Sequence, residues 1–160
     1  MRMTYFHAAL MCGLITLTIS SPTPADAQQQ PQASQQERAA HAGIRAAIDH
    51  YFKGHATGDS THMRKAFLPT AHIEGNREGK FTSWNVDDYC ARFSGKPAPD
   101  EARRSRRIDS IDVSGDSAMV KATLDHGDIV FTDYFVMLNV NGEWRIANKV
   151  YYGRSVRSAG

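Results

Sequence analysis

The residue pair Asn141-Gly142 constrains the fold of this chain more than any other feature. Asn and Gly tolerate the positive φ angles of a two-residue type I′ turn, so the flanking apolar segments should pair as one antiparallel hairpin over residues 131–152. A two-residue turn also sets the register, and side chains alternate between the two faces of each strand. One face should therefore carry five pairs: Asn139 with Trp144, Met137 with Ile146, Phe135 with Asn148, Asp133 with Val150, and Phe131 with Tyr152.

This predicted face is apolar except for one acid, Asp133, and one deep amide, Asn148. Polar groups on a buried face need partners or a function. The face is therefore the clearest indication of a ligand pocket. We expect Asn148, Phe131, Phe135, Trp144 and Tyr152 to contact the ligand.

The first 27 residues have the three parts of a secretory signal. Arg2 is the basic start, an apolar run covers residues 8–19, and Ala25-Asp26-Ala27 is a small-residue cleavage site. The run has about 12 residues, whereas a membrane span needs about 20, so cleavage is favoured over a stable membrane anchor. We expect a periplasmic or secreted protein whose mature chain begins at Gln28.

Composition divides the chain into a signal peptide (1–27), a disordered Gln-rich tether (28–37), one domain (38–153) and a C-terminal tail (154–160). Cleavage leaves 18 basic and 16 acidic side chains, a balance that favours no nucleic-acid partner. Cys90 remains as the single cysteine, which excludes an internal disulfide and predicts a free buried thiol.

Four arginines gather at residues 103, 104, 106 and 107. They are suited either to phosphate or lipid head groups or, as is more typical, to a solvated strand edge that discourages edge-to-edge pairing. Metal and cofactor motifs are not predicted. His50, His55 and His62 do not share a helix face, and the chain has no nucleophile elbow or phosphate-cradling glycine loop.

Helices are predicted before strands along the chain. Apolar residues recur at helical spacing over residues 36–56, and Asp59 or Ser60 can cap a short second helix. Period-two patterns dominate after Pro99. The full set of expected elements is helices at 36–56, 60–67 and 86–93, a small hairpin of 72–74 with 80–84, and strands at 108–113, 118–124 and on both sides of Asn141-Gly142. This order predicts an α+β domain in which N-terminal helices cover one face of an antiparallel sheet.

Several local signatures in this order resemble the nuclear transport factor 2-like superfamily, in particular its putative lumazine-binding, SnoaL-like branch. They are Tyr51 with Gly54 and Gly58-Asp59; Met63-Arg-Lys-Ala-Phe67 with Pro69 and Ala71; Gly79; Asp87-Asp88-Tyr89; Ile111-Asp112-Val113 with Ala118; Phe131-Thr-Asp-Tyr134; and Gly142-Glu-Trp-Arg-Ile146 with Asn148-Lys149-Val150. The resemblance implies a cone-shaped curled sheet (a cystatin-like roll), helices closing its mouth, a pocket between them, and a dimer through the outer sheet face. It does not imply one activity.

The helical spacing itself places Tyr51 and His55 on the core-facing stripe of the first helix. They should then face Asp133 across the apolar pocket. Asp133 could act as a general base that takes a proton from a substrate carbon next to a carbonyl group, with His55 or Tyr51 donating to the developing enolate oxygen. Alternatively, Asp133 is a structural carboxylate held ionised by a neighbour such as His55 or Arg92.

Three functions therefore stay open: binding of a small, partly apolar molecule, catalysis as a cofactor-free isomerase, cyclase or dehydratase, and a non-catalytic assembly module. An open cavity would favour binding or catalysis, whereas a cone filled by side chains would favour the assembly module. An unpaired Asp133 would favour catalysis over binding. The opposite hairpin face is also rich in apolar residues, which predicts a homodimer through it.

Overall fold

The computed structural model describes residues 24–156, so the predicted signal segment lies outside the described residues as far as residue 23. Within the described part, no helix has both the length and the apolar character of a membrane span. The elements in chain order are α1 (Pro24–Thr57), α2 (Ser60–Ala66), β1 (Phe67–Arg77), β2 (Lys80–Asn85), α3 (Val86–Cys90), the short 3₁₀ helix η1 (Glu101–Arg103), β3 (Ser105–Ser114), β4 (Ser117–Asp125), β5 (Ile129–Val140) and β6 (Glu143–Ser155).

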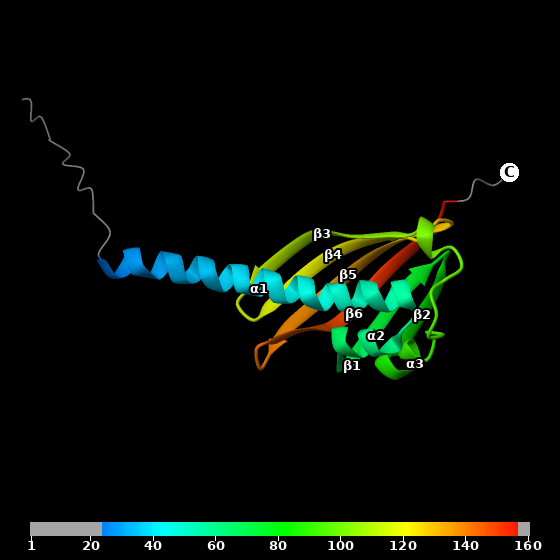
Figure 1. Ribbon diagram of the computed structural model, residues 1–160, viewed down its shortest axis with the longest axis horizontal. Coiled ribbons are helices and arrows are strands. Elements are labelled where there is room, and N and C mark those ends of the chain that lie inside the picture. Colours follow the sequence, from blue (N-terminus) through cyan, green and yellow to red (C-terminus); the bar gives the residue numbers. More distant parts are fainter. Residues whose placement is uncertain (1–23, 157–160) are drawn as a thin grey trace, which may run out of the picture.

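The six strands form one curled sheet in the order β2-β1-β6-β5-β4-β3. All neighbours are antiparallel except β1 and β6, which run parallel. Helix α1 lies across one face of the sheet, and α2 and α3 gather beside its C-terminal end (Figure 1). The predicted α+β architecture, a curled sheet covered by N-terminal helices, is confirmed.

Helix α1 packs on the sheet through the stripe that its sequence predicts. Ile44, Ile48 and Tyr51 are fully buried at steps of four and three residues. The helix nevertheless begins at Pro24 rather than near residue 36, and it runs through residues 28–37, where the sequence predicts a disordered tether. Gln, Ala and Glu have good helix propensity, so they can extend a helix that the packed turns have already nucleated.

The C-terminal end of α1 is tied to the loop after α3. Gly58 has φ +70°, the left-handed conformation that ends many helices, and its N–H donates to Gly54 O at 2.9 Å. The Gly58 carbonyl in turn accepts from Gly95 N–H at 2.8 Å. Asp59 then caps α2 by accepting from Thr61 N–H, as predicted. These bonds hold the loop of residues 91–99 beside the end of the helix.

The β5–β6 hairpin follows the predicted register only near its turn. Asn139 pairs with Trp144 and Met137 with Ile146. A β-bulge then places the extra residue Ala147 in β6, so that each later partner shifts by one. The shift turns Asn148 to the outer face and brings Lys149 inside.

The predicted pairs beyond the bulge are therefore wrong. Asp133 lies opposite Tyr151 instead of Val150, Phe135 opposite Lys149 instead of Asn148, and Phe131 opposite Gly153 instead of Tyr152.

The arginine cluster leads into β3, one of the two edge strands of the sheet. Acids neutralise most of it. Arg104 pairs with Asp100 at 2.8 Å, Arg106 contacts Glu101 with two nitrogens, and Arg107 pairs with Asp109 at 2.8 Å. This pairing favours the interpretation of a protected sheet edge over that of an anion-docking patch. Cys90 is buried and free, as expected, and burial raises the pKa of its thiol.

Candidate functional site

A cavity of about 400 Å³ opens at the end of the sheet where α1, α3 and the 91–99 loop meet. Its volume is within the range of small-molecule sites. Aromatic side chains make much of the wall: Tyr51, Trp84, Tyr89, Phe93, Phe131 and Tyr151. The polar lining residues include His55, Arg92, Ser94, Lys96, Arg104, His126, Asp133 and Lys149. The cone is therefore not filled by its own side chains.

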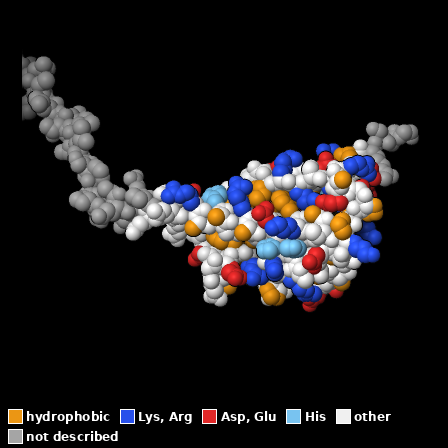
Figure 2. Space-filling model, viewed as in Figure 1, with side chains coloured by type: hydrophobic (Ala, Val, Ile, Leu, Met, Phe, Trp, Pro, Cys, Tyr) orange, Lys and Arg blue, Asp and Glu red, His pale blue; other side chains and the backbone are white. Residues whose placement is uncertain are grey.

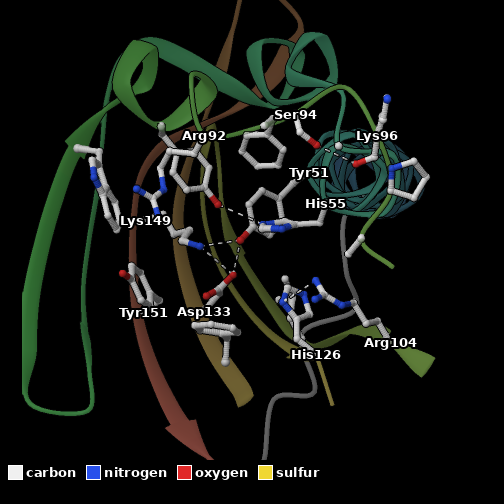
Figure 3. Close-up of a pocket in the computed structure, with 18 of the residues that line it drawn as sticks. Tyr51, His55, Arg92, Ser94, Lys96, Arg104, His126, Asp133, Lys149 and Tyr151 are labelled. Carbon is white, nitrogen blue, oxygen red and sulfur yellow. Dashed lines mark hydrogen bonds and ion pairs between the residues drawn. The ribbon is translucent and has the colours of Figure 1, made fainter. Parts of the chain in front are cut away.

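Tyr51, Asp133 and Lys149 form a compact buried triad in this wall (Figure 3). Tyr51 donates its hydroxyl proton to Asp133 Oδ2 at 2.6 Å. Lys149 Nζ donates to Tyr51 Oη at 2.6 Å and to the same Asp133 Oδ2 at 3.1 Å. Asp133 Oδ1 is buried and has no hydrogen-bond partner among the described residues.

The triad is an ion pair bridged by a neutral phenol. Burial and the Asp133 carboxylate raise the pKa of Tyr51 well above its ordinary value, so Tyr51 keeps its proton. Burial acts to lower the pKa of Lys149, but the Asp133 carboxylate, together with the Tyr89 and Tyr151 side chains, outweighs it and the pKa is raised. Lys149 is thus a cation and not an amine nucleophile. Its ammonium also lies 4.9 Å from the centroids of the Tyr51 and Tyr151 rings, a cation–π arrangement.

Two histidines of the wall are neutral. His55 Nε2 lies 3.1 Å from Tyr89 Oη, and burial together with Lys149 lowers the pKa of His55 well below its ordinary value. Burial and Arg104 lower the pKa of His126 to about 4. Arg104 Nη1 lies 3.4 Å from His126 Nδ1, and because a guanidinium can only donate, Nδ1 accepts and Nε2 carries the proton. That Nε2–H is buried and has no acceptor among the described residues.

A flat aromatic wall stands on β2 and β6. The rings of Trp84 and Tyr151 stack with an interplanar angle of 5°. Tyr151 is held in place from two sides, because its hydroxyl contacts Thr82 Oγ1 and its ring lies over Gly75. A Cβ at Gly75 would meet the Tyr151 ring at 2.4 Å, so only glycine leaves room for this ring position.

The three predicted catalytic residues, Asp133, His55 and Tyr51, all line the cavity, as does Phe131. Two other predicted contacts are core residues. Phe135 packs on the Tyr51 ring, and Trp144 packs against Gly43 near the middle of α1. Neither lines this cavity.

The placement of Asn148 and Tyr152 in the pocket is wrong, because the bulge at Ala147 turns both outward. Asn148 Oδ1 accepts from His72 N–H at 2.8 Å, and Tyr152 is 55% exposed. Val150, expected beside Asp133, is likewise exposed on the outer face.

The sequence-based prediction missed Lys149, Tyr151, Trp84 and His126. It named Arg92 only as a possible ionic partner of Asp133, and that partner is Lys149. The unbulged register places Lys149 and Tyr151 on the face of the hairpin opposite to that of Asp133. One signal could have found Lys149. An acid on a buried face needs a cation, and Lys149 is the basic residue on the other strand of the hairpin that is closest to the level of Asp133. Trp84, Arg92 and His126 carry no motif that predicts their role.

The model of the family described as Putative lumazine-binding matches residues 39–152. No curated protein matches the sequence.

Among solved structures, the chain is similar to an NTF2-like protein of unknown function from Silicibacter pomeroyi, with 28% identity, a TM-score of 0.64, and coverage of 71% of this chain and 94% of the other. A second such protein, from Shewanella baltica, gives 28% identity, a TM-score of 0.63 and coverage of 71% and 93%. A third such protein, from Methylobacillus flagellatus, gives 27% identity, a TM-score of 0.62, and coverage of 71% of this chain and 91% of the other.

The family match spans more than half of the chain, and the similar structures share its curled sheet and helical cover. The chain therefore belongs to the putative lumazine-binding family of the nuclear transport factor 2-like superfamily.

Proposed function

We propose that this domain binds a small, partly apolar molecule in the aromatic cavity without converting it. The observation that carries the proposal is the open volume of about 400 Å³ lined by six aromatic side chains. The family description supports a small-molecule ligand. Aromatic walls with a few directed polar groups are typical of ligand pockets.

The arrangement of Asp133 favours binding over catalysis. A general base must be free to accept a proton from the substrate. Asp133 Oδ2 already accepts from both Tyr51 and Lys149, and the carboxylate is paired with a cation. The remaining oxygen, Oδ1, is the atom on which an isomerase, cyclase or dehydratase function would depend.

Native mass spectrometry of the protein purified from its own source tests the binding function. A retained compound of constant mass is the expected result. The variant Ala98→Trp, which fills the cavity from a half-buried lining position, should lose it. The matched control Ala102→Trp adds the same ring at an exposed position on η1 and should keep the compound. Retention of the compound by Ala98→Trp would contradict the proposal.

We also propose that the protein is exported and acts in the periplasm or outside the cell. The supporting observation is the signal-like order of charge, apolar run and small residues in the first 27 residues. Sequencing the N-terminus of the protein from its source should find Gln28 first. An intact Met1 would contradict export by cleavage.

Assembly as a homodimer is the further part of the proposal. The outer sheet face exposes a group of apolar side chains, which we call the outer patch: Met119, Tyr134, Val136, Leu138, Val150 and Tyr152. A contiguous exposed apolar patch on a sheet is typical of an interface between two copies.

A further inference from the structure

Arg92 and Lys149 both line the cavity, and the balance of their charges indicates the charge of the ligand. Arg92 lies in the turn after α3 and Lys149 on β6, and Lys149 Nζ points to Tyr51 and Asp133 (Figure 3). Each lies on aromatic rings: the Arg92 guanidinium is 4.8 Å from the Trp84 ring centroid, and Lys149 Nζ is 5.6 Å from that of Tyr89. The rings hold both charges in place without neutralising them.

The acids of the wall balance only one of these charges. Asp133 is the single acidic residue that lines the cavity, and it pairs with Lys149 at 3.1 Å. Arg104, at the other side of the cavity, is balanced by Asp100 at 2.8 Å. Lys96 lines the cavity too, but its side chain extends away from it (Figure 3). Among the described residues, Arg92 has no acidic partner.

A buried donor points to the same conclusion. His126 Nε2–H lies in the wall without an acceptor, and an unsatisfied buried donor in a native structure is unusual. The wall thus offers one unbalanced positive charge and one unused N–H. Both are complementary to an oxyanion, and a guanidinium can bind a carboxylate with two parallel N–H donors.

We propose that the ligand is a small organic acid with a flat apolar body, whose single anionic group binds Arg92 while its body packs on the Trp84–Tyr151 wall. This inference rests on the proposed binding function and names the class of its ligand. One negative charge on the ligand would balance the one positive charge that the cavity leaves over.

The difference in affinity between 2-naphthoate and its neutral analogue 2-naphthamide tests the inference. The two probes share ring and shape and differ in charge. Calorimetric titration of the full chain should give about tenfold tighter binding of 2-naphthoate, the difference that about 1.4 kcal/mol from one charge-assisted interaction produces. Added salt should reduce the preference, because Arg92 is exposed to solvent.

Arg92→Gln should remove the preference for 2-naphthoate and leave the affinity for 2-naphthamide unchanged. Arg92→Lys keeps the charge but not the two parallel N–H donors, so it should retain part of the preference for 2-naphthoate. Binding by this variant would also show that the fold tolerates a change at this position. The matched control Arg38→Gln removes an exposed cation of α1 that does not line the cavity, and it should behave as the unaltered protein.

The possible failures are distinguishable. Equal affinity for the two probes, or a preference that persists in Arg92→Gln, would overturn the anionic class and leave the binding function standing. Failure of both probes to bind, with no shift of the Trp84 indole NMR signal, would overturn this inference. The binding function itself would be overturned only in the mass-spectrometric test, by the absence of a retained compound from the unaltered protein or by its retention in Ala98→Trp.

Discussion

Asp133 illustrates how one polar residue on an apolar face determines the chemistry around it. A buried carboxylate without partners would cost several kcal/mol, and the triad removes this cost with one cation and one hydroxyl. The phenol of Tyr51 bridges the two charges because it accepts from Lys149 and donates to Asp133 Oδ2, which Lys149 also contacts directly. The triad also orients Lys149 into the cavity.

We predict that Asp133→Asn will reduce the free energy of unfolding by about 3–5 kcal/mol, because it leaves the Lys149 ammonium buried without its counter-charge. Lys149→Met should reduce the free energy of unfolding by a similar amount, because it leaves the Asp133 carboxylate buried without its cation. The double variant Asp133→Asn/Lys149→Met should cost less than the two single changes added together. Urea unfolding followed by circular dichroism measures all three.

Additive losses in this cycle would contradict the coupling of the pair. Unchanged stability of Asp133→Asn with loss of an activity would instead favour the enzyme hypothesis, in which Asp133 is a free base. Tyr51→Phe provides a milder comparison, since it removes the bridging hydroxyl while keeping the ring.

Stability should also fall as the pH is lowered from about 6.5 to about 4, and His126 is one cause. Its pKa is lower in the folded than in the unfolded state, so the unfolded chain binds more protons in this window and unfolding is favoured by acid. His55, whose pKa is lowered in the same direction, adds to the effect. His126→Gln should flatten this part of the stability profile, measured by thermal unfolding across pH. His72→Gln, at an exposed position, is the control, and an unchanged slope in His126→Gln would contradict the assignment.

At the residue scale, the sequence correctly predicts the cavity residues whose positions follow from regular helical or strand spacing. Tyr51 and His55 follow from the helical stripe of α1, and Asp133 follows from the alternation of β5. Lys149 does not follow, because local alternation gives no reason to place a lysine inside and an asparagine outside. Its position depends on the Ala147 bulge, a long-range feature of how the sheet curls.

At the element scale, the loop of residues 91–99 is held by glycine. Gly58 combines a left-handed backbone with close contact: an added Cβ would lie 2.1 Å from the Lys96 carbonyl oxygen. The α1 terminus and the rim of the cavity are therefore one unit. The predicted boundaries of this part of the chain are only approximate. Helix α3 ends at Cys90 rather than at residue 93, because Ala91 and Arg92 continue only as turns.

Gly58→Ala should accordingly reduce the free energy of unfolding by about 3 kcal/mol or more, since strain at positive φ adds to a clash with backbone. Gly115→Ala separates the two terms. Gly115 also has a positive φ, +58°, but nothing lies within 4 Å of the added Cβ, so this control should cost about 1–2 kcal/mol. Equal losses in the two variants, measured by denaturant unfolding, would contradict the proposed tie between α1 and the loop.

At the scale of the whole molecule, the two faces of the sheet have different surroundings. One face is covered by α1, and Figure 2 shows acidic and basic side chains interspersed over that side of the protein. The opposite face carries the outer patch, in which Val136 is 50% and Val150 51% exposed. The bulge contributes to this patch, because it turns Val150 and Tyr152 outward. A second copy is the partner that would cover such a surface by symmetry.

Val136→Glu/Val150→Glu should therefore convert a dimer into a folded monomer. Both positions are half-exposed in one copy, so the carboxylates remain hydrated in the monomer but would meet apolar surface, and by two-fold symmetry one another, in the dimer. Sedimentation velocity should give twice the chain mass for the unaltered protein and the single mass for the variant, with unchanged circular dichroism. Ala42→Glu/Ala46→Glu places the same charges at exposed positions of α1 and should remain dimeric. A monomeric unaltered protein, or a variant that stays dimeric, would show that the outer patch is not the interface.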